Sequence, residues 1–161
     1  MQIDTLKIEN TAFDVLDEAG IEEPVVDAVK IASSRSIAVK EIEMPENFSD
    51  VAGFYNNKEK TIYVAKMDKP VRKLFTVAHE LGHIFLGHKQ YDVLFRIPKP
   101  DVSYTRAEKE ANIFAANLLM PEFMVKEYMD KYNLTRLDYV RLAEIFGVPI
   151  PAMRDQLEHI R

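Results

Sequence analysis

The sequence predicts an α+β fold in which a small antiparallel β-sheet packs with several helices. Three short segments rich in β-branched and aromatic residues lie close together in the first half of the chain and predict strands. These strands are expected over residues 36–42, 51–55 and 61–65. Helical periodicity dominates the rest of the chain, and a sheet confined to one region among helices is typical of α+β domains.

The direction of the predicted sheet follows from its turns. Residues 56–60, Asn-Asn-Lys-Glu-Lys, form a polar segment between the second and third predicted strands. A short polar turn between two strands favours an antiparallel hairpin. The sequence therefore predicts antiparallel pairing in this sheet.

Apolar residues at helical spacing predict helices along most of the chain, several of them ended by Gly20, Pro121 or Gly147. The expected helices are 11–19, 24–33, 71–88, 106–120, 122–131, 137–146 and 151–160. Residues 89–105 contain two prolines and are expected to be irregular. Such a segment between two long helices is either a lid over a site or a plain connector.

Composition excludes several classes of protein. With 161 residues, 47% hydrophobic and 29% charged, the chain is typical of one globular domain. No apolar run approaches the ~18 residues of a membrane span, and residues 1–10 lack the pattern of a secretory signal. The sequence has no cysteine, which removes disulfides and thiolate ligands and suits a reducing cytoplasm. A net charge of −5 argues against nucleic acid as a direct partner.

The segment His79-Glu80-Leu81-Gly82-His83 carries the strongest chemical signal. On a helix, residues i and i+4 lie one above the other, so His79 and His83 direct two imidazoles at one point. Imidazole nitrogen suits Zn²⁺, and this motif occurs in zinc peptidases. Glu80 is placed to take a proton from water beside the metal. The alternative is two histidines that only pack, and the separate apolar face of this helix argues against it.

A carboxylate on the next long helix is expected to be the third ligand, because a catalytic zinc site usually has three protein ligands. On the helix 106–120, Glu108 borders the alanine-lined buried face, whereas Glu110 lies about 200° around the helix from it. Glu108 is therefore preferred over Glu110, and Asn112, one turn after Glu108, is expected to orient a ligand. The alternative is that both glutamates are solvated residues of the first helical turn.

His88 closely follows His83 and has to be weighed as a ligand. The zinc motif with a third histidine requires glycine at position 86 and histidine at position 89, where this chain has Leu86 and Lys89. His88 also lies about 140° around the helix from His83, so it cannot reach the same ion while the helix continues. We expect His88 to lie at the end of the helix.

Two longer segments resemble one known family. Residues 72–83, RKLFTVAHELGH, resemble the R-x-x-F-T-x-A-H-E-L-G-H signature of ImmA/IrrE family metallopeptidases. Residues 108–121, EKEANIFAANLLMP, resemble that family's E-x-x-A-N-x-F-A-x-x-L-L-M-P, in which Glu108 takes the place of the third metal ligand. The resemblance implies a gluzincin-like zinc peptidase. We expect a single domain over residues 1–161, divided into an N-terminal helix region (1–20), a zincin-like core (21–121) and a C-terminal helical segment (122–161).

The resemblance also implies a substrate and roles for residues. The expected activity is cleavage of a helix-turn-helix transcriptional repressor in the cytoplasm, with Zn²⁺ or alternatively Mn²⁺ as the cofactor. Glu80 is expected to be the general base. Tyr91, Tyr104 and His88 are candidates to donate a hydrogen bond to the oxyanion. The strand at 61–65 either pairs with an extended substrate at the sheet edge or only completes the sheet.

Residues 142–153 raise a rival class, a DNA-binding regulator. In this segment a small alanine is followed four residues later by a turn glycine, which resembles a helix-turn-helix. A recognition helix needs cations for phosphates, and residues 149–161 offer only Arg154 and Arg161. A packing role is therefore expected for this segment. A second rival is a metal-binding regulator or scaffold without catalysis, against which the intact Glu80 argues.

Overall fold

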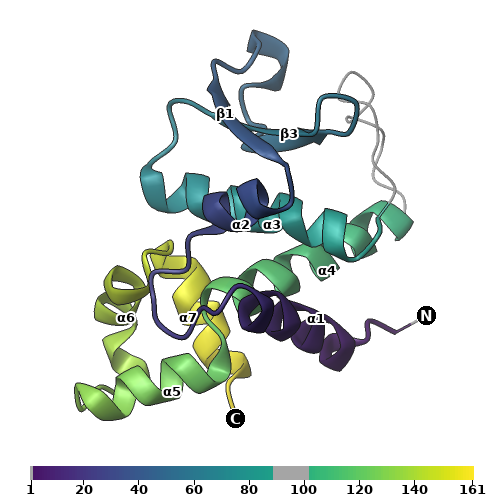
Figure 1. Ribbon diagram of the computed structural model, residues 1–161. Helices are drawn as coiled ribbons and strands as arrows, with labels where there is room; N and C mark the ends of the chain where they lie inside the picture. The colour runs from purple at the N-terminus through teal and green to yellow at the C-terminus, as the bar shows by residue number, and fades with distance from the viewer. Residues whose placement is uncertain (1, 89–101) are drawn as a thin grey trace.

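The computed structural model describes residues 2–88 and 102–161, with the backbone alone for 102–105. A small sheet lies on one side of helices α2 and α3, and helices α1 and α4 lie on the other side (Figure 1). Helices α5, α6 and α7 form the end of the molecule farthest from the sheet. This arrangement confirms the predicted α+β fold. The helices are α1 (Thr5–Glu18), α2 (Ala28–Ser34), η1 (Glu46–Phe48), α3 (Pro70–Phe85), α4 (Val102–Leu119), α5 (Glu122–Lys131), η3 (Arg136–Asp138), α6 (Tyr139–Phe146) and α7 (Ile150–His159).

The sheet is mixed, so the prediction of an antiparallel sheet is correct for only one of its two strand pairs. Its strands are β1 (Ala38–Ile42), β2 (Gly53–Asn56) and β3 (Thr61–Ala65), in the order β1-β3-β2. The short turn between them makes β2 and β3 an antiparallel hairpin, as expected. β1 pairs in parallel with β3, because the connection 43–60 is long enough for a crossover. β3 is therefore the central strand, and the suggestion that it pairs with a substrate at the sheet edge is wrong.

Helix α3 packs closely on both of its neighbours through glycines. A Cβ added at Gly82 would lie 3.0 Å from the carbonyl oxygen of Ala111 and 3.2 Å from the Cβ of Phe114, both on α4. On the other side of α3, a Cβ added at Gly53 of β2 would lie 2.5 Å from the Thr76 Cγ2. Glycine at these positions permits approaches that a larger side chain would obstruct. The separation of α3 and α4, which sets the geometry of the site, therefore depends on Gly82.

Several helix boundaries differ from the expected ones because local caps decide them. α1 begins six residues earlier than expected, after Asp4, and α2 begins four residues later, after Asp27. Each aspartate accepts a hydrogen bond from a backbone amide of its helix at 3.1 Å. α4 begins four residues earlier than expected, at Val102. Residues 89–101 lie outside the described residues, so their role as a lid or a connector stays a prediction.

The C-terminal helices pack into the core. Leu142, Phe146 and Met153 are fully buried. Gly147 ends α6 with a φ of 65°, and a Cβ added there would lie 2.9 Å from the Val25 Cγ1. The segment that resembles a helix-turn-helix is therefore tied to the rest of the molecule, in agreement with the expected packing role.

Candidate metal centre

Helix α3 carries two imidazoles one turn apart. Pro70 stands in its first turn, where a missing amide hydrogen costs no helical hydrogen bond. The Nε2 atoms of His79 and His83 are 3.1 Å apart. The side chain of His79 is 15% exposed and that of His83 is 11% exposed. Both rings therefore lie mostly shielded from water, with two nitrogens directed at one point.

Glu108 on α4 completes a three-residue cluster that could hold a metal ion. Its Oε2 lies 3.1 Å from the His79 Nε2, and its Oε1 lies 3.0 Å from the His83 Nε2. Ligand atoms at ~2.0–2.1 Å from a tetrahedral Zn²⁺ stand about 3.3 Å apart. The three residues therefore fit one ion with small outward shifts. The structure thus brings together the two histidines and the preferred carboxylate.

Within this cluster, Glu108 and His79 each favour the charged form of the other. Burial disfavours the ionised form of Glu108, but hydrogen bonds from His79 and His83 outweigh it and hold the pKa of Glu108 well below its usual range. Burial likewise disfavours the protonated form of His79, yet Glu108 and Glu80 raise the pKa of His79 above its ordinary value of 6.5. An anionic carboxylate between two imidazoles therefore favours a cation at this point, either a proton or a metal ion.

Glu80 follows His79 on α3 and is only 3% exposed. With His79 and Glu108 it lines a large groove, and it is not part of the three-residue cluster. A carboxylate beside a metal cluster, facing a groove, has the position that a general base requires.

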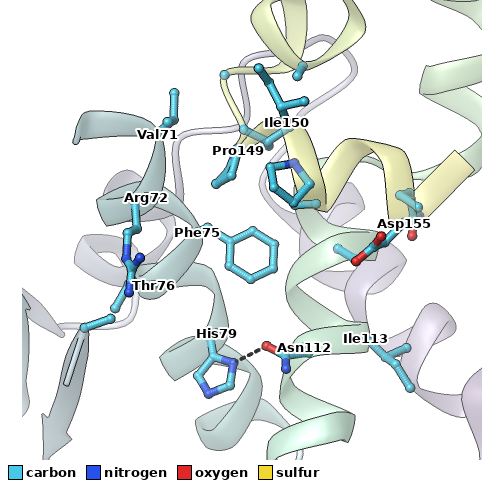
Figure 2. A pocket seen from close by; sticks show the side chains of 18 of the residues that line it. Val71, Arg72, Phe75, Thr76, His79, Asn112, Ile113, Pro149, Ile150 and Asp155 are labelled. Atoms are coloured by element: carbon cyan, nitrogen blue, oxygen red, sulfur yellow. Dashed lines mark hydrogen bonds between the residues drawn. The ribbon is translucent and has the colours of Figure 1, made fainter. Parts of the chain in front are cut away.

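Asn112 supports His79 from the neighbouring helix. Its Oδ1 lies 2.8 Å from the His79 Nδ1 (Figure 2). A carbonyl oxygen can only accept, so this contact places a hydrogen on the His79 Nδ1. The Nε2 then donates to Glu108 when the ring is protonated, and its lone pair is available to a metal ion when the ring is neutral. The structure places Asn112 where a ligand-orienting residue was expected.

Helix α3 ends at Phe85, three residues before the expected end, and this brings His88 back toward the cluster. Gly87 has a φ of 68°. The amides of Gly87 and His88 donate to the carbonyls of Ile84 and His83 at 3.2 and 3.0 Å, which is the Schellman pattern of a helix end. The His88 Nδ1 consequently lies 2.9 Å from the His83 Nδ1. His88 lies near the helix end, as expected, but its contact with His83 was not predicted.

Glu110, the less favoured ligand, is not part of the metal cluster and contacts His88 instead. Its Oε2 lies 2.9 Å from the His88 Nε2, and its Oε1 accepts a hydrogen bond from the Arg106 Nε at 2.6 Å. Its side chain is 15% exposed, so the alternative of a solvated glutamate is wrong for Glu110. Burial disfavours its ionised form, but Arg106 and His88 hold the pKa of Glu110 below its usual value.

The three candidate oxyanion donors differ in what the structure shows of them. Tyr91 lies outside the described residues, and only the backbone of Tyr104 is described, within α4. His88 has both ring nitrogens engaged, by His83 and by Glu110. The role of oxyanion donor therefore stays a prediction for the two tyrosines.

A groove of about 1560 Å³ leads from the cluster to the turn between α6 and α7. Figure 2 shows Phe75 of α3 between His79 and the turn residues Pro149 and Ile150. Acidic side chains outnumber lysine and arginine among the described residues of its wall. Besides Glu80 and Glu108, the lining acids are Glu9, Asp50, Asp68, Glu122, Glu144 and Asp155, and the lining lysine and arginine are Lys69 and Arg72.

The helix pair, the cluster and the adjacent glutamate agree with the arrangement that the H-E-x-x-H motif predicts. The profile of a peptidase family described as the IrrE N-terminal-like domain matches residues 34–158. The chain belongs to this family. The resemblance based on the two motifs is thereby confirmed.

Two similar proteins extend this comparison. The chain is 30% identical over 102 residues to "Uncharacterized immunity region protein 2" of Bacillus phage phi105, covering 62% of this chain and 61% of that protein. A solved structure of a Mycobacterium tuberculosis transcriptional regulator matches with a TM-score of 0.69 and 18% identity, over 91% of this chain and 44% of that chain. The second similarity is one of fold. The chain spans less than two thirds of the length of either protein.

Within the described ranges, no helix is both long enough and apolar enough to cross a bilayer.

Proposed function

We propose that the protein is a metal-dependent endopeptidase that uses one Zn²⁺ ion, with Mn²⁺ as the alternative. The observation that carries this proposal is the convergence of His79, His83 and Glu108 in a member of a peptidase family. These three residues would hold the ion, which when bound polarises the scissile carbonyl and lowers the pKa of water. The buried Glu80 beside them is needed for hydrolysis and has no use in a purely structural metal site.

Other residues of the chain are proposed to carry out proton transfer, ligand orientation and stabilisation of the oxyanion. Glu80 accepts a proton from the attacking water and passes it to the leaving amine. Asn112 keeps the His79 ring turned with Nε2 toward Glu108. A tyrosine, Tyr104 or Tyr91, is the proposed hydrogen-bond donor to the oxyanion, because both nitrogens of His88 are already engaged.

The proposed substrate is a helix-turn-helix transcriptional repressor in the cytoplasm, cleaved at one or a few sites. The motif resemblance supports this, as does a relative named an immunity region protein of a phage. The groove adds a physical argument, because its acidic wall favours a substrate segment that carries lysine or arginine. DNA-binding proteins contain such basic segments. Phe75 and Ile150, the latter 44% exposed, offer apolar contacts along the same groove.

A cleavage time course tests this proposal. Purified candidate repressors, beginning with one encoded next to this gene, are incubated with the zinc-loaded protein and analysed by gel and mass spectrometry. Glu80→Gln keeps the size of the side chain and removes its basicity, so cleavage should fall by at least ~100-fold with the metal retained. Glu127→Gln, at an exposed position of α5, is the matched control and should cleave at the wild-type rate.

Two results would reject parts of the proposal. Cleavage by Glu80→Gln at the wild-type rate would remove Glu80 as the general base. Failure of the metal-loaded wild type to cleave any repressor would favour the metal-binding regulator without catalysis.

Direct binding of DNA is the other rival class, and the packing of the α6–α7 unit disfavours it. Met153 of α7 is fully buried, and Arg154 and Arg161 are the only lysines or arginines of residues 149–161. Few phosphates could be neutralised by so few cations. An anisotropy titration with duplex DNA at physiological salt should show no nanomolar, sequence-specific binding. Such binding would put the DNA-binding class first.

A further inference from the structure

We propose that His88 is a positioning residue that fixes the tautomer of His83, with Glu110 and Arg106 behind it. The proposal rests on the metal site of the proposed function, but it does not depend on catalysis there. It assigns a purpose to three side chains that neither hold the ion nor line the groove among the described residues.

The four side chains form a continuous series of contacts leading away from the cluster. The Nδ1 atoms of His83 and His88 are 2.9 Å apart, and the His88 Nε2 is 2.9 Å from the Glu110 Oε2. The Arg106 Nε donates to the other oxygen of Glu110 at 2.6 Å. The side chains of His83, His88 and Glu110 are only 11–15% exposed, so water is a poor substitute for these partners.

One arrangement of hydrogens allows every hydrogen bond from His83 to Glu110 and leaves the lone pair of the His83 Nε2 available to a metal ion. A metal ligand needs a lone pair on the His83 Nε2, so its hydrogen must be on Nδ1. That hydrogen is donated to the His88 Nδ1, which must then carry its own hydrogen on Nε2. The His88 Nε2 hydrogen is donated to the Glu110 carboxylate, which Arg106 keeps ionised. The carboxylate at one end thus selects the tautomer of both imidazoles.

The competing explanation is that the contact between His88 and Glu110 only ties the end of α3 to α4. The backbone itself already ends the helix, because the Gly87 and His88 amides donate to Ile84 and His83 carbonyls. A tie between helices would need the His88–Glu110 contact and would not need an acceptor facing His83. The two explanations therefore depend on different nitrogens of the same ring.

Two substitutions separate these nitrogens. In His88→Asn, the side-chain oxygen takes the place of Nδ1, so the acceptor for His83 is kept and the contact with Glu110 is lost. In His88→Gln, the amide nitrogen takes the place of Nε2, so the contact with Glu110 is kept and the acceptor for His83 is lost. His159→Asn is the control, because the His159 Nδ1 bonds the Asp155 carbonyl of its own helix.

The first measurement is Zn²⁺ affinity, obtained by competition with a chromophoric chelator. We expect His88→Gln to bind Zn²⁺ 10–100-fold more weakly than wild type, the usual effect of losing a residue behind a metal ligand. His88→Asn and His159→Asn should bind close to wild type. Wild-type affinity in His88→Gln, or a loss in His88→Asn as large as in His88→Gln, would overturn the proposal.

The second measurement needs no metal. Nitrogen-15 NMR of the metal-free protein, at a pH well above the imidazole range, reports which His83 nitrogen carries the hydrogen. In the metal-free protein Glu108, whose Oε1 lies 3.0 Å from the His83 Nε2, competes with His88 for the single hydrogen of His83. We therefore expect a larger population with hydrogen on Nδ1 in wild type and His88→Asn than in His88→Gln. An unchanged ratio of the two His83 tautomers in His88→Gln would overturn the proposal. Because this result is independent of cleavage, its failure is distinguishable from failure of the proposed peptidase function.

Discussion

The two imidazoles of the proposed metal site have different surroundings. His79 contacts the amide of Asn112, and both residues line the groove. His83 contacts a second imidazole, His88, and in the described part of the chain neither of these two lines the groove. The side that lines the groove therefore has a neutral supporting partner. The charged support, Glu110, lies on the other side, where it would not compete for the cationic substrate segment of the proposed function.

Removal of Glu108, the ligand that both histidines share, should cause the largest loss of Zn²⁺ affinity. Glu108→Gln replaces the carboxylate that contacts both histidines, and we expect Zn²⁺ affinity to fall by more than ~100-fold. Glu110→Gln acts only on the His83 side and should weaken binding by about tenfold. Competition titrations of both variants give the two values. Equal losses would mean that ligand and supporting residue have been wrongly distinguished.

The second prediction concerns the separation of α3 and α4, on which the surroundings of both His79 and His83 depend. A methyl group at Gly82 would lie 3.0 Å from the Ala111 carbonyl oxygen, so Gly82→Ala should force α3 and α4 apart. We expect the free energy of unfolding to fall by about 1–3 kcal/mol, as is usual for an overpacked core. Urea unfolding of the metal-free protein measures it. An unchanged free energy of unfolding would show that the helices do not depend on this close contact.

The third prediction tests the support of His79, the histidine that lines the groove. Asn112→Leu keeps a similar shape but removes the acceptor for the His79 Nδ1, so Zn²⁺ affinity should fall by about tenfold. Asn112→Asp keeps an acceptor and should bind Zn²⁺ at least as tightly as wild type. A chelator competition assay compares the two variants, and similar affinities would remove Asn112 from the support of His79.

The fourth prediction concerns the turn that carries His88. Gly87 and Gly20 have φ values of 68° and 64°, and a Cβ added at either would meet nothing within 4 Å. Alanine at either position should therefore cost about 1 kcal/mol of unfolding free energy through backbone strain alone. Only Gly87→Ala should also weaken Zn²⁺ binding, because it displaces His88. A matching loss of affinity in Gly20→Ala would contradict this separation.

The smallest expected effect is the pH dependence of the metal-free protein. The pKa of His79 is raised above 6.5, so the stability from its pairing with Glu108 is complete below that pH and is lost as pH rises through the raised value. The pKa of Glu108 is lowered from 4.5, so its contribution is present above 4.5 and is lost as pH falls through the lowered value. Thermal unfolding in chelator should show the largest excess in Tm of wild type over Glu108→Gln between about pH 4.5 and 6.5. An excess that grows above this window would contradict the assignment.

The centre of the site could be predicted because it depends on spacing along helices. The interval of four residues aligns His79 with His83, and the position of Glu108 at the edge of a buried face follows from helical geometry. The same arguments separated Glu108 from Glu110. They required only that the helices exist and that their apolar faces meet.

The surroundings of the site depend on features that local spacing does not decide. The parallel pairing of β1 follows from the path of the connection 43–60, which no short motif specifies. His88 turns back because the helix ends at a left-handed Gly87. That glycine was a visible stop signal, but the apolar periodicity that continues past it favoured a longer helix. At the start of α2, Pro24 competed with Asp27 as a start signal, and the capping hydrogen bond of Asp27 decided the outcome.

The proposed ligands are divided between α3 and α4, at opposite ends of residues 83–108. A bound ion would close this stretch into a ring, as a chemical cross-link does, and so reduce the conformational entropy of the unfolded chain. Transient opening of the first turns of α4 would then require release of the ion. Hydrogen exchange at those backbone amides would follow metal occupancy, so the local stability of this part of the fold would depend on the metal supply around it.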